Sequence, residues 1–428
     1  MAHRSRIGCP RVLAALIVTA AASIVASPAP AQPAGPTTVL PVGALLSITG
    51  GGSSLGNTSR AALEVAAARW NQRLASTGTR VTLDIVDTGQ DPARAVTGFQ
   101  ALAARGVRII IGPQSSSEVA AIQPLANAQG ILVVSQGSTA SSLAMPDDNV
   151  FRFVPNDHVE GRATVDLLAR QGVRTLVPLW RDDRGNQGLA DSVRAAATAD
   201  GIQVTPGFRY EPDTTDYTPA LQAVAAQVAA ATQQVGAGHV GVYLAGFEEV
   251  ADVLAAARTQ PGLASVRWYG GDGSAQATQL VDNRAAAGFA VAAQGFPSPL
   301  VALPAASARA NAALIRQISR RAHATPDAFA LSAYDAFNVA VQTLRHAGPN
   351  PTGPALRAAF ASTAAGYPGV TGTIRLDEFG DRASDPYAYW SICRVGRARP
   401  RWLRTGTWTP NSSDPTGPGQ VVGGTCPR

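Results

Sequence analysis

The stretch VRIIIGPQSSSEVAAIQPLANAQGILVVSQGST, residues 107–139, decides the fold class. Two short aliphatic runs, at 107–111 and 131–135, are separated by a segment whose apolar residues recur at helical spacing. Each run ends in a turn rich in glycine and hydroxyl residues. Short buried strands that alternate with helices are typical of parallel β-α-β units, so this stretch predicts an α/β fold.

The same alternation extends in both directions and restarts once, near 154–158. We expect two halves, each a doubly wound parallel sheet with helices on both faces. Two consecutive helices, 307–323 and 326–346, suggest that the chain returns to cover the first half. Beyond 394 we expect an irregular chain. The predicted strands are 39–47, 81–86, 107–111, 131–135, 176–180, 204–210, 240–244, 266–270, 289–293, 371–376 and 387–393.

Composition and the amino terminus restrict the class of protein. The 428 residues include 35 basic ones, all arginine, and 29 acidic ones; the net charge of +6 is too modest and dispersed for a nucleic-acid-binding protein. Arg4, Arg6 and Arg11 precede an apolar run at 12–26, and small residues suited to cleavage follow. The run is shorter than the ~20 residues that a membrane span needs. We therefore predict a signal peptide over 1–31 and a periplasmic location.

Export to an oxidising compartment allows the cysteines to form a disulfide. Cys393 and Cys426 are the only cysteines after the signal peptide, so we expect a disulfide between them, with two buried thiols as the alternative. The cysteines and histidines show no metal-ligand spacing, and we expect no metal and no cofactor. An arginine-rich run between the cysteines is expected to be a solvated face, with a docking patch for an anionic partner as the alternative. It contains Arg394, Arg397, Arg399, Arg401 and Arg404.

Two loops follow the strands of the opening stretch and carry candidate binding groups. The first contains Ser115 and Ser116, and the second contains Ser138 and Thr139. Each is expected to open a helix, whose free N–H groups attract anions. Each loop alone is more simply an N-cap. Adjacent parallel strands direct both loops to one crevice, however, and together the loops predict a carboxylate site.

A third candidate lies in the second half, where Asp272 stands among glycines at 270–274, after a predicted strand. The glycines allow a ligand or another backbone segment to approach closely. Asp272 is either an N-cap or the partner of an ammonium group. Opposite a carboxylate site, it would complete the recognition of an amino acid head group.

Two motifs near the first strand suggest other functions. Residues 52–56, Gly-Ser-Ser-Leu-Gly, match the G-x-S-x-G pattern of hydrolases, but that turn needs earlier strands and an oxyanion loop. A loose dinucleotide-binding fingerprint is formed by Gly50, Gly52 and Gly56 together with Asp87. The third glycine and the acid do not have the spacing that this fingerprint requires. A flexible turn is the simpler interpretation, and a secreted hydrolase is the least favoured function.

These residues and their order resemble the periplasmic solute-binding proteins of branched-chain amino acid ABC transporters, which have the type I periplasmic-binding fold and include leucine/isoleucine/valine-binding proteins. The resemblance runs from about 39 to 392. It rests on the order and spacing of several segments together. These are 43–47 with Gly56; Asp87 with Asp91, Pro92 and Ala95; 111–117 with 130–135; 334–336; and 371–374 with Asp377, Gly380 and Asp381.

The resemblance implies a ligand site between two lobes. Ser116 and Thr139 match the residues with which the family binds the ligand carboxylate. Gly137 matches a backbone carbonyl that accepts from the ammonium group. Asp272 matches the acidic partner of that ammonium, and Phe247 matches an aromatic residue that contacts the head group.

Two further positions differ from the pattern of the family. Leu55 stands where an aromatic residue of the first lobe often lines the pocket. Gly185 stands where the family often has an aromatic residue, which is expected to widen the pocket, with Arg184 or Asn186 adding polar contacts. Aliphatic amino acids, amides, urea and aromatic acids are therefore all candidate ligands.

The resemblance also implies the domain organisation and the function. Residues 36–155 plus 297–370 are expected to form lobe 1, 156–296 plus 371–395 to form lobe 2, and 396–428 to form a C-terminal tail. Crossovers at these boundaries form a three-strand hinge on which the lobes close.

We expect a monomeric binding protein, not an enzyme, that captures an amino acid or a related small carboxylate or amide. It would deliver this ligand to a membrane ABC permease. A ligand-sensing subunit of the same fold that reports to a receptor is the main alternative.

Overall fold

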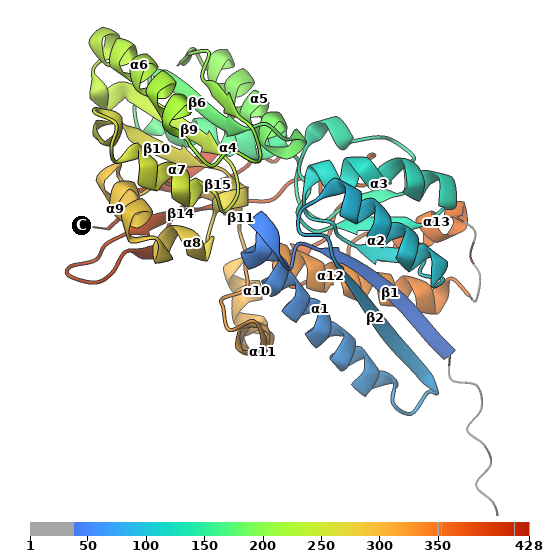
Figure 1. Ribbon diagram of the computed structural model, residues 1–428. Helices are drawn as coiled ribbons and strands as arrows, with labels where there is room; N and C mark the ends of the chain where they lie inside the picture. The colour runs from blue at the N-terminus through green and yellow to red at the C-terminus, as the bar shows by residue number, and fades with distance from the viewer. Residues whose placement is uncertain (1–37, 349–350, 352, 415, 428) are drawn as a thin grey trace, which may run out of the picture.

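The computed structural model describes residues 38–348, 351, 353–414 and 416–427. The predicted signal peptide over 1–31 lies outside this range. Within the described residues, no helix is both long enough and apolar enough to span a membrane. Figure 1 shows two α/β lobes, and each contains the predicted parallel sheet with helices on both faces.

The first lobe is built on a five-stranded parallel sheet in the order β2-β1-β3-β4-β5. Its central strands β3 and β4 are aliphatic except for Ser135 at the end of β4, because helices bury both faces. Helices α1 and α12 pack on one face, and α2 and α3 pack on the other. The strands are β1 (Thr38–Leu46), β2 (Thr79–Asp87), β3 (Ile109–Ile111), β4 (Leu132–Ser135) and β5 (Val150–Arg152). The helices are α1 (Ser53–Leu74), α2 (Pro92–Ala104), α3 (Ser116–Gln129), α11 (Ala312–Ala322), α12 (Ala328–His346) and α13 (Gly353–Ala364).

The second lobe has a parallel sheet in the order β10-β9-β6-β7, in which β8 also pairs with β6. The predicted strand 204–210 is therefore two short strands. The strands are β6 (Thr175–Arg181), β7 (Gln203–Val204), β8 (Phe208–Tyr210), β9 (Val240–Ala245) and β10 (Arg267–Gly270). The helices are α4 (Asp157–Arg170), α5 (Arg184–Ala199), α6 (Thr218–Val235), α7 (Val250–Ala257), α8 (Thr278–Asp282) and α9 (Arg284–Ala292).

The predicted strand at 289–293 is wrong, because these residues lie at the end of helix α9. The side chain of Asn283 accepts hydrogen bonds from the N–H groups of Ala285 and Ala286 and so begins the helix. Ala286, Phe289 and Ala290 are then buried at helical spacing. A short apolar run fits either structure, and here the cap and the burial pattern decide.

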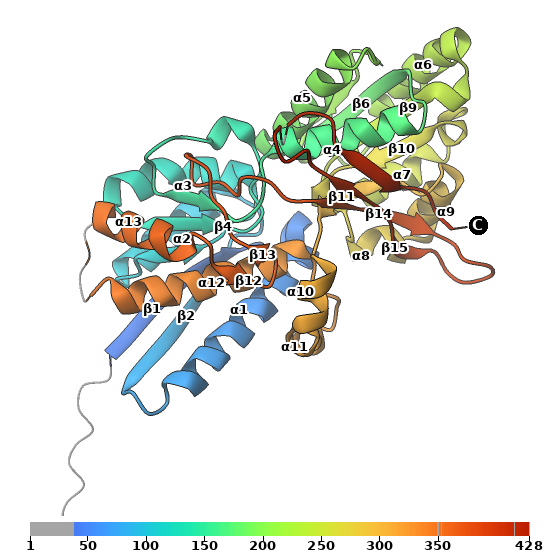
Figure 2. The same cartoon turned by 180° about the vertical axis from the view of Figure 1, so that it is seen from behind.

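The prediction of an irregular chain beyond 394 is also wrong. Residues Arg401–Thr409 form β15 and Gln420–Gly423 form β16, in an antiparallel sheet of order β11-β14-β15-β16 with β11 (Ser298–Val301) and β14 (Tyr387–Cys393). Trp408 of β15 is fully buried, and its Nε1–H donates to Asp166 of α4 at 2.7 Å. The sheet lies against the second lobe (Figure 2).

A disulfide joins Cys393 at the end of β14 to Cys426 beyond β16. It closes a segment with a sequence separation of 33 residues, and this segment contains the arginine-rich run, which extends from the end of β14 into β15. Within the described residues, none of these arginines forms an ion pair, and all five are exposed. The disulfide thus fixes the end of the chain to the second lobe.

The chain passes between the lobes after β5, after β11 and again before β14 (Figures 1 and 2). The second passage leads through α10 (Ala305–Ala310) to α11 and α12. The third follows the short strands β12 (Pro368–Gly369) and β13 (Gly372–Thr373). The division of the chain at 155, 296 and 370 stays a prediction.

Candidate ligand-binding site

A cavity lies between the lobes and brings together residues that are far apart in the sequence. Of the nine predicted binding residues, all but Ser138 line it. The first lobe contributes Leu55, Gln114, Ser115, Ser116, Gly137, Thr139 and Phe329. The second lobe contributes Gly185, Asn186, Leu189, Phe247, Asp272 and Gly273.

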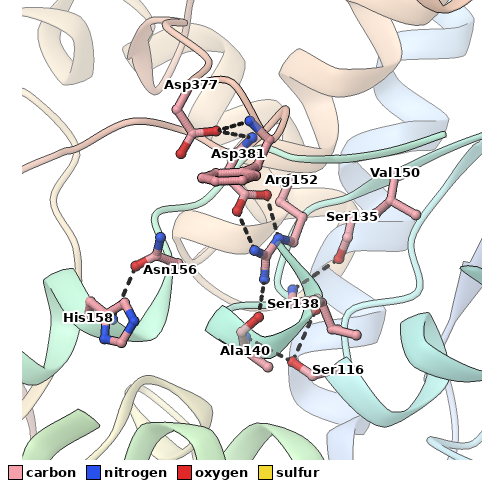
Figure 3. Close-up of polar contacts among 12 residues, drawn as sticks. Ser116, Ser135, Ser138, Ala140, Val150, Arg152, Asn156, His158, Asp377 and Asp381 are labelled. Atoms are coloured by element: carbon pink, nitrogen blue, oxygen red, sulfur yellow. Dashed lines mark hydrogen bonds and ion pairs between the residues drawn. The ribbon is translucent and has the colours of Figure 1, made fainter. Parts of the chain in front are cut away.

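The two hydroxyl-rich loops of the first lobe are joined by hydrogen bonds at one end of this cavity. The Oγ of Ser116 accepts from the N–H of Ala140 at 3.3 Å and from the Oγ of Ser138 at 3.0 Å (Figure 3). Ser138 therefore lies behind Ser116 and supports it. Ser115 is the N-cap of α3, because its Oγ accepts from the N–H of Glu118. The N-terminus of α3 thus faces the cavity, as an anion site requires.

The expectation that both loops open a helix holds only for the first. A single 3-10 turn, Ser141–Leu143, follows the second loop, and β5 comes next. The second loop is shaped instead by Ser135, whose Oγ accepts from the N–H groups of Gly137 and Ser138. Thr139 therefore offers its own polar groups to the cavity without a helix dipole behind it.

A buried ion pair that sequence analysis missed supports the second loop from behind. Arg152, at the end of β5, pairs with Asp381 and donates from a terminal guanidinium nitrogen to the carbonyl oxygen of Ala140 at 2.7 Å (Figure 3). Asp381 lies in the third passage between the lobes, and its N–H donates to Asp377. The pair ties the loop to two of the three connecting segments. Arginine is common in this chain, so nothing in the sequence distinguished Arg152.

The acidic side of the cavity belongs to the second lobe. Asp272 begins the 3-10 turn Asp272–Ser274 after β10, and its N–H donates to Oε1 of Glu160 at 2.9 Å. Burial raises the pKa of Asp272 to about 6. Asp272 lines the same cavity as the α3 N-terminus, from the opposite lobe.

Apolar side chains form the remaining walls of the cavity. Leu55 of α1 and Phe329 of α12 face it from the first lobe, and Leu189 of α5 and Phe247 face it from the second. Leu189 and Phe329 were not predicted, because an apolar residue on a helix normally indicates a core position. Gly185 keeps the space beside Ser116 open, since a Cβ atom there would lie 3.4 Å from the Oγ of Ser116.

The glycine- and serine-rich turn at 50–56 contacts the other lobe. The carboxylate of Glu248 accepts from the N–H of Ser54 at 2.6 Å and from the Oγ of Ser53 at 3.2 Å. The Oγ of Ser54 donates to Gln279 at 2.8 Å. Gln279 in turn donates to Glu248 at 2.6 Å. The turn therefore holds the lobes together next to Leu55, which lines the cavity, a role that the G-x-S-x-G pattern did not indicate.

The α5 N-terminus makes a second set of contacts between the lobes. The N–H of Arg184 donates to the Oγ of Ser117, and its guanidinium donates to the Oγ of Ser142. Of the two polar neighbours of Gly185, Asn186 lines the cavity, whereas Arg184 contacts the other lobe outside it. Contacts at two places thus surround the cavity, which corresponds to a closed arrangement of the lobes.

Comparisons with known proteins agree with this architecture. Residues 39–392 match the family model described as periplasmic binding protein. The Leu/Ile/Val-binding protein BraC3 of Rhizobium johnstonii is 23% identical over 352 residues, covering 82% of this chain and 90% of that protein.

Two solved structures are also similar. The leucine-binding protein LivK of Thermotoga maritima has a TM-score of 0.69 at 20% identity and covers 85% of this chain and 97% of its own. A solute-binding protein of an ABC transporter from R. palustris, in complex with benzoate, has a TM-score of 0.69 at 17% identity. The match covers 90% of this chain and 99% of that protein's chain. These structures share the fold of two lobes around a cleft. The chain therefore belongs to the periplasmic binding protein family and is a solute-binding protein with the type I fold, not an enzyme.

Proposed function

We propose that this protein captures a small amino acid in the cavity between its lobes and delivers it to a membrane ABC permease. One observation carries the proposal: the α3 N-terminus, with Ser116 and Thr139 beside it, shares a single cavity with Asp272. The first end favours a carboxylate, and the second favours an ammonium group. A zwitterion satisfies both ends, and the walls of leucine and phenylalanine suit an apolar side chain.

Closure of the lobes is the physical basis of the capture. A ligand held by both lobes adds contacts that exist only in the closed state, so it raises the population of that state. The contacts of Glu248 and Gln279 with the α1 N-terminus form in the same movement. We place the protein in the periplasm as a monomer, in agreement with the predicted signal peptide.

Aromatic acids are the other ligand class to consider, because the R. palustris protein binds benzoate. Benzoate has a carboxylate and an apolar ring, but it has no group for Asp272. A buried carboxylate that faces the ligand without a cation or a donor is costly, and this favours an amino acid.

A panel of ligands tests the proposal by thermal unfolding and calorimetry. The panel contains L-leucine, L-isoleucine, L-valine, benzoate, 4-methylpentanoate, which lacks the ammonium group of leucine, and 3-methylbutylamine, which lacks the carboxylate. A ligand at 100-fold excess over its Kd stabilises a protein by about 2.7 kcal/mol. We expect stabilisation by an amino acid and little by either truncated analogue. Equal stabilisation by 4-methylpentanoate, or by benzoate alone, contradicts the proposal.

Uptake of the ligand by cells distinguishes transport from sensing. We expect a strain without this protein to lose high-affinity uptake of the bound amino acid and to regain it with the wild-type gene. Normal uptake in the deletion strain, together with a lost chemotactic or transcriptional response to the ligand, supports the sensing alternative instead.

A further inference from the structure

A buried group of acids and phenols lies behind Asp272, away from the ligand cavity. Glu160 and Asp157 of α4, Tyr243 of β9 and Tyr387 of β14 are each no more than 1% exposed. Many of their polar atoms have no hydrogen-bond partner: both carboxylate oxygens of Asp157, Oε2 of Glu160 and both phenol oxygens. The group therefore holds three carboxyl groups, with that of Asp272, and little that could stabilise three charges.

The positive charge that acts on Asp157 is that of Arg152. The Arg152 guanidinium already pairs with Asp381 and donates to the carbonyl oxygen of Ala140. Ionised carboxylates that are buried close together without a counter-charge are strongly disfavoured, so some of them take up a proton. The question is which carboxyl group remains ionised.

Geometry distinguishes Glu160 from Asp272. Oε1 of Glu160 accepts the N–H of Asp272, which fixes the Glu160 carboxyl against the turn. An ionised Glu160 leaves Oε2 without a donor. A protonated Glu160 is itself a donor, and we assign as its acceptor the carboxylate of Asp272, which lies within its reach. Protonation of Glu160 therefore satisfies an atom that ionisation leaves unpaired.

The electrostatic surroundings agree with this assignment. Burial and the neighbouring acids Asp272 and Asp157 raise the pKa of Glu160 well above its usual range. Burial raises the pKa of Asp272 only to about 6, because the hydrogen bond from Glu160 opposes the increase. Burial raises the pKa of Asp157 to about 7. The phenols of Tyr243 and Tyr387, which face the same acids, stay neutral because burial raises their pKa.

We infer that Glu160 is a positioning residue that stays neutral and donates a hydrogen bond to Asp272, so that Asp272 alone presents a negative charge to the ligand. Glu160 does not touch the ligand. It holds the Asp272 turn through Oε1 and stabilises the Asp272 carboxylate through Oε2. The protonation of Glu160 is independent of the ligand, whereas its effect on binding rests on the proposed function.

The substitution Glu160→Gln tests this assignment directly, because an amide reproduces a protonated carboxyl group. Its oxygen can accept the N–H of Asp272, and its NH₂ can donate to the carboxylate. With L-leucine as the probe, we expect the Kd of Glu160→Gln at pH 7 to stay within about threefold of the wild-type value. We expect Glu160→Ala and Asp272→Asn each to weaken binding by roughly tenfold or more.

The opposite pattern overturns the inference. If Glu160 is ionised and attracts the ligand by its own charge, Glu160→Gln weakens binding as strongly as Asp272→Asn. Glu211→Gln is the control, because it replaces an exposed glutamate of the same lobe that does not line the cavity. This control should leave the Kd unchanged.

Thermal unfolding without ligand provides a second test, which can be performed even if the protein does not bind L-leucine. A carboxyl group whose pKa is raised by folding adds stability at low pH and loses that contribution as the pH rises through its folded pKa. The wild-type Tm should therefore fall as the pH rises above about 5, and Glu160→Gln should reduce this fall. Asp157 and Asp272 account for part of the remainder. Glu211→Gln, at an exposed position, should not alter it.

The two measurements separate the inference from the proposed function. Identical pH dependence of Tm in the wild type and Glu160→Gln contradicts the neutral Glu160. If the wild type binds no amino acid but the pH dependence differs as described, the amino acid ligand is wrong and the assignment of Glu160 stands.

Discussion

Glu248 offers a direct way to perturb closure without touching the ligand cavity. Its carboxylate accepts hydrogen bonds from the N–H of Ser54 and the Oγ of Ser53 on the other lobe, and from Gln279 on its own. It does not line the cavity. The substitution Glu248→Ala removes all three bonds, and the two contacts with serines exist only when the lobes are closed.

The expected effect follows from these contacts. A hydrogen bond to a charged group contributes about 1.5–3 kcal/mol, and here the donors regain water when the lobes open. We take about 2 kcal/mol for the set, the lower part of that range, because Glu248 is only half-buried. This energy corresponds to about a 30-fold lower ratio of closed to open protein. If the ligand binds the closed state only, its Kd rises by up to the same factor.

Stopped-flow fluorescence with L-leucine, or with the amino acid that the panel identifies, measures the effect. We expect the dissociation rate to account for most of the change, since the contacts form after the ligand has entered. Glu248→Gln keeps an acceptor without the charge and should be intermediate. Glu211→Ala, an exposed acid of the same lobe, is the control. A wild-type dissociation rate in Glu248→Ala would refute this account of closure.

Three further predictions concern the carboxylate site, the disulfide and the buried acid Glu118. Ser116→Ala and Thr139→Ala should each weaken binding of a carboxylate ligand by roughly 1–3 kcal/mol in calorimetry, and unchanged affinity in both rejects the carboxylate site. Reduction of Cys393–Cys426 should lower stability by up to roughly 3–4 kcal/mol for its 33-residue separation. Ligand affinity should barely change, and two free thiols in the denatured, unreduced protein reject the bridge. Burial raises the pKa of Glu118 to about 7. The substitution Glu118→Gln should therefore reduce the fall of Tm between about pH 5 and about pH 8. If Tm falls with pH as steeply in this variant as in the wild type, the prediction is wrong.

Much of the fold could be predicted because local patterns and tertiary structure agree. The aliphatic runs at 107–111 and 131–135 are buried strands of a parallel sheet, and their loops meet at one edge as such a sheet requires. The errors arose where the pattern was short or open to two interpretations. The alanine-rich run at 289–293 has a single β-branched residue, Val291, and ends a capped helix. The strand β15 depends on pairing with β14, and β16 depends on pairing with β15; no local signal shows either pairing.

The candidate site could be predicted where a residue type had a chemical reason to be there. Hydroxyl-rich loops at strand ends and an acid among glycines pointed to Ser116, Thr139 and Asp272. Supporting residues such as Glu160 and Arg152 could not be predicted, because their roles depend on contacts between distant segments. An acid on a helix normally indicates a solvated face, and only burial shows that Glu160 differs.

The measurement that tests the central claim most directly is a binding cycle between Asp272 and the ligand ammonium group. Calorimetry compares the wild type and Asp272→Asn, each with L-leucine, or the amino acid that the panel identifies, and with its deaminated analogue, 4-methylpentanoate for leucine. We expect Asp272→Asn to weaken the amino acid by roughly tenfold or more, since it leaves a buried ammonium without its counter-charge. The same substitution should leave the analogue unchanged or bind it more tightly. Equal losses for both ligands, or none for either, would contradict the recognition of an amino acid by this cleft.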